Sequence, residues 1–182
     1  MLNFCSLYSG SSRKLSICWI RKYKITYRCW SKSKKNRIRI RNFRCFSFFY
    51  WRSTYYSNKF KIAEKFSIKD IEINAFEIPH DAANPCGFNL NCQKDKITIA
   101  TDIGHITNDI LKQLEGSKFI LLESNYDTEV LKYSKYPFSL KQRISGPNGH
   151  LSNESASKVI NYLLHDNLQT AMLGHLSKES NF

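Results

Sequence analysis

Four residues of the types that bind divalent metals each lie at or just after the end of an apolar, strand-like run. They are His80 after residues 71–78, Asp102 after 96–100, Glu123 at the end of 119–123, and His175 after 170–173. Imidazole nitrogens and carboxylate oxygens are ligands for ions such as Zn²⁺ and Mn²⁺. Polar residues gathered at strand ends form the sites of many α/β proteins. The pattern therefore indicates a metal site where these strands end.

Asp102 taken alone has two interpretations. The run before it suits a sheet interior, with Ile97, Ile99 and the small Ala100, and Gly104 ends the run with a turn. An aspartate in that place can cap or turn the following segment. It can also be a metal ligand held on a rigid element. A single histidine at a strand end is likewise more often structural than a ligand, so it is His80, Asp102 and His175 together, in that order, that favour a metal site.

Alternating strands and helices must position these residues. The predicted strands are 71–78, 87–90, 96–100, 119–123 and 170–173, and the predicted helices are 107–116, 127–133 and 152–164. Thr107 and Ser152 are the expected N-caps, and Gly116 is expected to close the first helix. This order of elements predicts the α/β class or a layered sandwich.

The charge divides the chain into two parts that meet near residue 60. The net charge is +13, yet residues 1–60 hold 15 Lys and Arg with no acid, and the remainder holds 13 Lys and Arg against 15 acids. All three tryptophans precede residue 60, and all five histidines follow it. With 42% hydrophobic residues, the chain can bury a core. The length suits one domain with a short extension.

The sequence gives no sign of a membrane or secretory protein. It holds no apolar run of about 18 residues, and its start lacks the charged and apolar regions of a secretory signal. Its six cysteines are scattered without a C-x-x-C pair. We therefore expect neither a zinc knuckle nor a disulfide framework, but reduced thiols in the cytoplasm and no membrane partner.

The basic segment 13–59 has no acid, glycine or proline, and it shows no persistent helical period. Three interpretations remain open. It can be a nucleic-acid-binding arm, with Lys and Arg for phosphates and aromatics for stacking. It can be an organelle-targeting segment, although the predicted strand and turn before it and its aromatics argue against this. It can also be an out-of-frame translation.

The third interpretation can be tested on paper. When residues 13–32 are given AT-rich codons and read from the second base of each, a glycine turn, a strand, a polar hairpin and a second strand ending in aspartate are permitted. This text joins the turn at Ser9–Ser12 without a break. The frameshift interpretation is therefore favoured over the basic arm.

Six short segments, in order, resemble the metallo-β-lactamase-fold hydrolases, in particular the small bacterial YycJ/WalJ-type branch. They are Phe4–Ser12, Pro79–Pro85, Ile99–Gly104, Leu121–Asp127, Gly149–Glu154 and Leu173–Glu179. The resemblance covers residues 1–12 and 61–182. It implies an αββα sandwich, incomplete here in its N-terminal half, with two divalent metal ions between the sheets. The hairpin obtained by shifting the frame is also what the family carries at that place.

The resemblance assigns roles to particular residues. It places metal ligands at His80, Asp102 and His175, with Asp102 as the carboxylate that touches both cations. Asp102 and His150 are the expected catalytic residues, with His150 beside the ligands or on the substrate side. Zn²⁺ is the default metal and Mn²⁺ the alternative. A metal-bridging hydroxide would then attack a phosphodiester, as in a DNA exonuclease.

The chain departs from the family in one respect that decides its activity. The signature H-x-H-x-D-H is absent, and no histidine precedes His80. The family's usual extension after the last Gly-His-Leu-Ser is also missing. Three ligands are too few for two metals. We therefore expect weak metal binding, no turnover, and apolar sheet edges left uncovered.

Two functions from different classes follow. The first is a metal-dependent phosphodiester hydrolase, inactive as written, whose partner is nucleic acid as substrate. In it residues 1–12 form the first strand and turn, 13–60 an aberrant, poorly ordered segment, and 61–182 the C-terminal part of the domain. The second is a non-catalytic nucleic-acid-binding protein that uses the basic aromatic segment.

Overall fold

The computed structural model describes residues 65–68, 70–164 and 167–181, residue 62, and the backbone of five strands within the first sixty residues. The chain forms two compact units, Met1–Phe60 and Lys61–Phe182. Each unit is described by itself. The residues expected to do chemistry all belong to the second.

The first unit contains a five-stranded antiparallel sheet in the order β1-β2-β3-β4-β5. Its strands are β1 (Leu2–Tyr8), β2 (Leu15–Ile20), β3 (Tyr23–Tyr27), β4 (Arg37–Arg41) and β5 (Tyr55–Lys59). The first of these coincides with the edge strand expected at the start of the chain. The prediction of an aberrant, poorly ordered segment falls largely on residues outside the described ones, and it stays a prediction.

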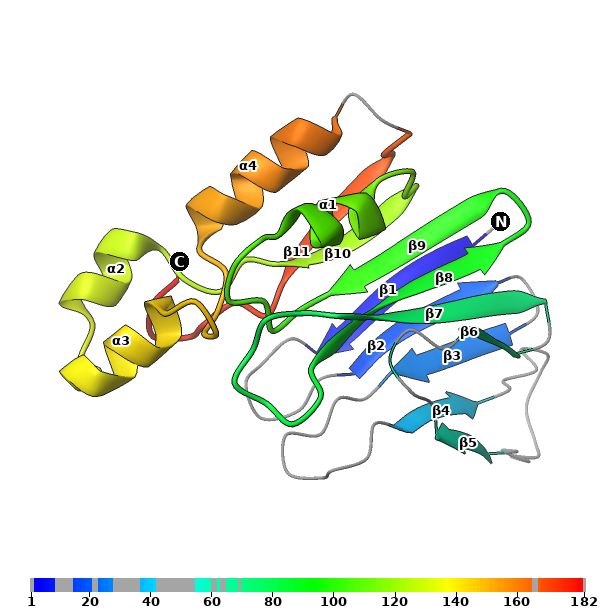
Figure 1. The fold of residues 1–182 in the computed structure, drawn as a ribbon, viewed down its shortest axis with the longest axis horizontal. Helices are drawn as coiled ribbons and strands as arrows, with labels where there is room; N and C mark the ends of the chain where they lie inside the picture. Colours follow the sequence, from blue (N-terminus) through cyan, green and yellow to red (C-terminus); the bar gives the residue numbers. More distant parts are fainter. Residues whose placement is uncertain are drawn as a thin grey trace. The chain divides into compact units, whose positions relative to one another are not determined.

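The second unit is built on a six-stranded sheet in the order β11-β10-β9-β8-β7-β6 (Figure 1). Its strands are β6 (Lys65–Ile68), β7 (Ile71–Glu77), β8 (Cys86–Cys92), β9 (Asp95–Ala100), β10 (Phe119–Glu123) and β11 (Thr170–Gly174). Strands β6 to β9 pair antiparallel, whereas β10 pairs parallel with both β9 and β11. As a result, β7, β9, β10 and β11 all end at the same edge of the sheet.

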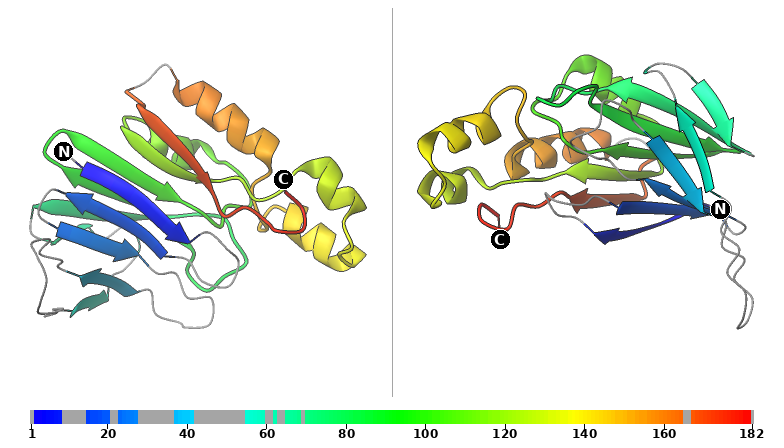
Figure 2. Two further views of the ribbon diagram at one scale, coloured as in Figure 1. Left: turned by 180° about the vertical axis from the view of Figure 1, so that it is seen from behind. Right: turned by 90° about the horizontal axis from the view of Figure 1, so that it is seen from below.

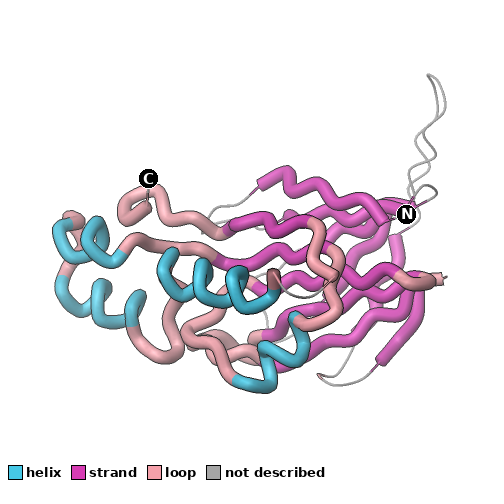
Figure 3. The backbone as a smooth tube through the Cα atoms, turned by 90° about the horizontal axis from the view of Figure 1, so that it is seen from above, coloured by secondary structure: helices cyan, strands magenta, loops and turns pink. Residues whose placement is uncertain are grey.

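Four helices complete the second unit (Figure 3). They are α1 (Asn108–Leu114), α2 (Thr128–Tyr133), α3 (Phe138–Ser145) and α4 (Asn153–Leu163). Side-chain oxygens of Thr107, Asp127 and Ser152 cap α1, α2 and α4 and satisfy N–H groups that a helix start leaves unpaired. No helix in the described part of the chain is long and apolar enough to cross a membrane.

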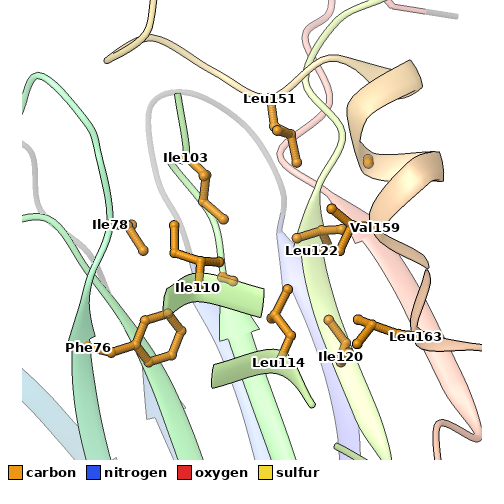
Figure 4. Packing of buried hydrophobic residues seen from close by; sticks show 12 residues of the cluster. Phe76, Ile78, Ile103, Ile110, Leu114, Ile120, Leu122, Leu151, Val159 and Leu163 are labelled. Carbon is orange, nitrogen blue, oxygen red and sulfur yellow. The ribbon is translucent and has the colours of Figure 1, made fainter. Parts of the chain in front are cut away.

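Helices α1 and α4 pack on one face of the six-stranded sheet, which Figure 2 shows from two further sides. Figure 4 shows the core between them, where Leu114 of α1 and Val159 of α4 lie over Ile120 and Leu122 of β10. The helices contribute residues at a spacing of three or four, and the strand contributes alternate residues. This is the packing that the two periodicities dictate.

The sequence prediction missed two elements of this unit. Strand β6 was not predicted, although it pairs with β7 over four residues. Helix α3 was missed because it lacks the usual signals. Its N-cap, Pro137, makes no side-chain hydrogen bond, and none of its residues is buried. Without a buried face, an apolar period cannot reveal a helix.

We expect Leu122→Ala to lower the free energy of unfolding by about 2–5 kcal/mol, because it leaves a cavity in a core where Leu122 is fully buried. Urea unfolding followed by far-UV circular dichroism measures this. The matched control is Leu164→Ala, whose side chain is 61% exposed and which should change stability by less than about 0.5 kcal/mol. Equal losses in the two variants would show that this cluster is not the core.

Candidate metal centre

The residues that the sequence analysis identified at strand ends all lie at one edge of the six-stranded sheet. His80 follows β7, Asp102 follows β9, Glu123 is the last residue of β10, and His175 follows β11 directly. His150 enters from the loop that precedes α4. Because neighbouring strands are close and end together, side chains far apart in the sequence meet here.

Asp102 lies between two imidazoles. Its Oδ1 is 3.7 Å from Nε2 of His80 and 3.7 Å from Nε2 of His175. Both distances exceed a direct hydrogen bond. Two ligand atoms that are each about 2.1 Å from a tetrahedral Zn²⁺ lie about 3.4 Å apart. The two nitrogens and the carboxylate oxygen therefore have the spacing of ligands around a cation, with the oxygen placed to serve both sides.

The opposite nitrogens of these two imidazoles are fixed by the protein. Nδ1 of His80 lies 2.8 Å from the carbonyl oxygen of Gly149, and Nδ1 of His175 contacts Oε1 of Glu123. A carbonyl or an ionised carboxylate only accepts hydrogen bonds, so each Nδ1 carries the proton. In the neutral ring, Nε2 then presents its lone pair toward Asp102. This is the tautomer that a metal ligand needs, set by its outer partners.

Glu123 is a buried carboxylate that organises the centre. Its side chain is fully buried. Oε1 accepts from Nδ1 of His150, at 2.8 Å, and of His175, while Oε2 accepts from the backbone N–H of Ile103, at 2.6 Å, and of Leu151, at 3.4 Å. Four donors thus surround one anion, which is how a buried charge is tolerated.

The same contacts keep Glu123 ionised. Burial, the largest single influence, raises the pKa of Glu123. Hydrogen bonds from His150 and His175, together with the charges of those rings, outweigh burial and bring the pKa down from 4.5 to about 2. The carboxylate is therefore an acceptor at neutral pH, as the tautomers of both histidines require.

Asp102, Glu123, His150 and His175 form a group in which one ligand atom of each lies within 4.8 Å of the others. Glu123 is the poorest ligand of this group, because both its oxygens already accept hydrogen bonds. The ring of His150 lies 5.0 Å from that of His80 and 4.9 Å from that of His175, centre to centre. Glu123 is therefore better suited to holding the histidines than to binding a metal ion, and the assignment of His80, Asp102 and His175 as ligands stays a prediction.

Two of the site residues have an unusual backbone. Asp102 and His175 are not glycines, yet their φ angles are 65° and 58°. L-residues seldom adopt this left-handed conformation, and it persists only where surrounding contacts hold it. At Asp102 such contacts are close by, since the next N–H donates to Glu123 and the N–H of Gly104 donates to the carbonyl of Pro79 at 2.7 Å. The strain thus coincides with the candidate ligands.

Two asparagine side chains, Asn125 and Asn181, hold the backbone near His175. Nδ2 of the buried Asn125 donates to the backbone carbonyl of His175 at 2.8 Å. Nδ2 of Asn181 in turn donates to the carbonyls of Ser124, at 2.8 Å, and Asn125, at 2.9 Å. The chain after β11 therefore folds back onto the end of β10 and locks the turn that carries His175.

The structure brings together the four residues to which the sequence gave a role, His80, Asp102, His150 and His175. Their roles as ligands and catalytic groups stay predictions. The sequence gave no role to the other two histidines. His105 is exposed, and its ring is hydrogen-bonded to the carbonyl of Pro147, whereas His165 lies outside the described residues. The sequence placed Glu123 at a strand end but assigned it no role, and it gave no role to Asn125 or Asn181.

Next to His80, an ion pair joins the site to α3. Arg143 donates to the carboxylate of Asp81, and this hydrogen bond holds the pKa of Asp81 below its ordinary value. The sequence did not predict this pair, because Asp81 and Arg143 are 62 positions apart. It places the C-terminal end of α3 beside the candidate ligands.

We expect Glu123→Gln to lower the free energy of unfolding by about 3–5 kcal/mol, since it removes a buried charged acceptor shared by four N–H donors and places an amide NH₂ against some of them. The measurement is urea unfolding of the full chain without metal. The matched control is Glu129→Gln on the exposed surface of α2, where a change below about 0.5 kcal/mol is expected. An unchanged free energy of unfolding in Glu123→Gln would refute the organising role of this carboxylate.

Comparison with known proteins agrees with the architecture. Residues 40–175 match the family model of the β-lactamase superfamily domain. The chain is 31% identical over 122 residues to the exodeoxyribonuclease YycJ of Bacillus anthracis. It is 33% identical over 122 residues to the exodeoxyribonuclease WalJ of Streptococcus pneumoniae serotype 2.

These matches cover 67% of this chain but only 46% and 45% of the two relatives, so the matched part spans less than half of their length. The fold class and the resemblance that the sequence predicted are confirmed. Divalent metal ions are implied by this fold, and the donor set of histidines and aspartate suits them. The chain belongs to the β-lactamase superfamily, and within it to the YycJ/WalJ-type hydrolases of the metallo-β-lactamase fold.

Proposed function

We propose that this chain derives from a metal-dependent exodeoxyribonuclease that hydrolyses phosphodiester bonds of DNA. The observation that carries the proposal is the position of Asp102 Oδ1, 3.7 Å from the Nε2 atoms of two histidines whose Nδ1 atoms are both anchored. The names of the relatives supply the substrate class. Divalent metals in such sites polarise a phosphoryl oxygen and lower the pKa of water, and either Zn²⁺ or Mn²⁺ fits the donors.

The residues of this chain have distinct tasks in the proposal. His80, Asp102 and His175 would hold the metal, with Asp102 available to both sides of the site. His150, held by Glu123 at 2.8 Å, has its ring 5.0 Å from that of His80 and 4.9 Å from that of His175, and it would face the substrate. Its imidazole can hold or give a proton near neutral pH.

We further propose that the chain as written binds metal weakly and does not turn over. Only three of the ligands for two metals are present, and the H-x-H-x-D-H segment is absent from the sequence. A catalytic metal needs about three protein ligands of its own. In this proposal, residues 13–60 are an out-of-frame translation. The intact protein acts in the cytoplasm.

A second candidate is a non-catalytic nucleic-acid-binding protein. The observation in its favour is the run of 15 Lys and Arg without an acid in residues 1–60. An arm that engages many phosphates loses affinity steeply as salt rises. A misread segment should give only weak adhesion that is indifferent to the nucleic acid offered.

The coding DNA across codons 10–65 separates these candidates. We expect a single-base step near codon 13, with a compensating step before codon 61, to restore the glycine turn, the hairpin and a nearby His-x-His-x-Asp-His, because the shifted frame already yields a sequence like that of the family. Sequencing of the DNA, followed by expression of the restored frame, checks this. The restored protein should hydrolyse single-stranded DNA with added Mn²⁺ or Zn²⁺, and the present chain should not. Sound DNA, or normal hydrolysis by the present chain, would overturn the proposal.

In the restored protein, His80→Ala and His175→Ala should each weaken metal binding by at least about 100-fold, because even loss of an outer partner costs 10- to 100-fold. Isothermal titration with Zn²⁺ measures the affinity without relying on turnover. His105→Ala is the matched control, since His105 is exposed and is not part of the ligand set. An equal loss in all three variants would show that the assignment of ligands is wrong.

A further inference from the structure

The two most exposed large hydrophobic side chains of the described residues lie close together in the sequence. Tyr133 is 76% exposed at the end of α2, and Phe138 is 74% exposed at the start of α3. Single exposed aromatics are ordinary on a protein surface. Here, however, two exposed aromatics are separated by only four residues and belong to one pair of helices. They offer a binding surface to a partner with flat apolar faces.

The same helical pair carries a local positive charge. The α2–α3 segment, residues 128–145, holds Lys132, Lys135, Lys141 and Arg143 against the single acid Glu129. The rest of the second unit has the opposite balance, with 9 Lys and Arg against 14 acids. Within the segment Lys132 pairs with Glu129 and Arg143 with Asp81, so Lys135 and Lys141 carry its excess positive charge. Its partner should be an anion, and a long one if several lysines take part.

The segment is held as a platform and contributes little to the core. Helix α3 has no buried residue, and α2 buries only Leu131. The helices are joined by Lys141, whose Nζ donates to the carbonyl of Lys132 at 2.7 Å. Lys132 also lies 5.1 Å from the centre of the Tyr133 ring. An aromatic ring and a lysine thus lie side by side on the exposed part of this helical pair.

The platform adjoins the candidate metal centre. The carbonyl of Ile144 in α3 accepts from the N–H of His150 at 2.8 Å, and Arg143 pairs with Asp81, which follows His80. Figures 1 and 3 show α2 and α3 beyond the edge where β9 and β10 end. A polymer lying on the platform therefore leads toward the residues that would hold the metal.

We propose that the α2–α3 segment binds single-stranded nucleic acid, with bases stacked on Tyr133 and Phe138 and phosphates paired with the surrounding lysines. Stacking platforms combined with positive charge are how proteins hold unpaired strands. In a duplex the base faces are already stacked, so the surface selects unpaired or frayed strands. The inference rests on the proposed function, since it names the form of substrate that would reach that site.

The first test is binding of the full chain to fluorescent oligonucleotides in EDTA, where no metal-dependent hydrolysis takes place. Tyr133→Ala and Phe138→Ala should each weaken binding to oligo(dT) by about 5- to 100-fold, the usual effect of losing one stacking residue. The fold-loss in affinity should be the same at each salt concentration, because neither substitution removes a charge. Oligo(rU) in place of oligo(dT) shows whether the surface distinguishes RNA from DNA.

The matched control is Tyr162→Ala. Tyr162 is 54% exposed on α4, so its removal should leave binding unchanged. All three side chains are exposed, and thermal unfolding verifies that each variant is folded. Lys135→Ala should instead flatten the salt dependence, because one fewer phosphate contact is made. Wild-type affinity in both aromatic variants, or an equal loss for blunt duplex, overturns the proposal.

The basic N-terminal segment could also attract nucleic acid through its 15 Lys and Arg, so the position of binding has to be mapped. Photocrosslinking with an oligonucleotide that carries 5-iododeoxyuridine, followed by mass spectrometry, should label the peptide containing Tyr133 or Phe138. Label found only within residues 1–60 overturns the proposal. So does a dimer in light scattering that Phe138→Ala dissolves, because a second copy would then occupy the surface.

Failure of this inference and failure of the proposed function can be told apart. If the frame-restored protein hydrolyses DNA while the aromatic variants bind like the wild type, the surface is refuted and the enzyme stands. If no hydrolysis is found but the crosslinks map to α2–α3, the enzyme is refuted and the surface stands.

Discussion

The buried carboxylate of Glu123 is the constraint on which the rest of the site depends. An isolated ionised carboxylate in the interior costs several kcal/mol, and here four donors compensate for it. Two of these donors are imidazole rings, and the other two are backbone N–H groups next to Asp102 and His150. One anion therefore fixes the rotation of two histidine rings and the course of two loops. Without it, these rings and loops would lose the hydrogen-bond acceptor that they share.

The sheet topology makes this arrangement possible. Parallel pairing of β10 with both β9 and β11 brings the ends of three strands to one edge. The meander from β6 to β9 returns β7 to the same direction, so His80 arrives there as well. Helices α1 and α4 then bury the face of the sheet behind the edge. The stability of the core and the position of the site residues are thus consequences of the same strand order.

Much of this could be predicted from the sequence because the strands are short, apolar and clearly bounded. Residues at their ends were therefore visible as a group, and the predicted helices 107–116 and 152–164 agree closely with α1 and α4. The partners of Glu123 could not be predicted, since they lie 20 to 52 positions away and depend on which strands are neighbours. Helix α3 and the hydrogen bonds of Asn181 could not be predicted for a similar reason. Both are held by polar contacts, which leave no period in the sequence.

The contacts that fix the candidate ligands also explain how half of a metal centre can persist without the other half. His80 is held by Gly149, and His175 by Glu123 and Asn125. All three partners belong to the same unit as the ligands, Lys61–Phe182. The tautomers and positions of these histidines therefore do not need the missing H-x-H-x-D-H segment. Under the proposed function, its absence would remove ligands, and with them metal affinity, while the remaining donors stay in place. A site built in this way would lose its chemistry well before it lost its geometry.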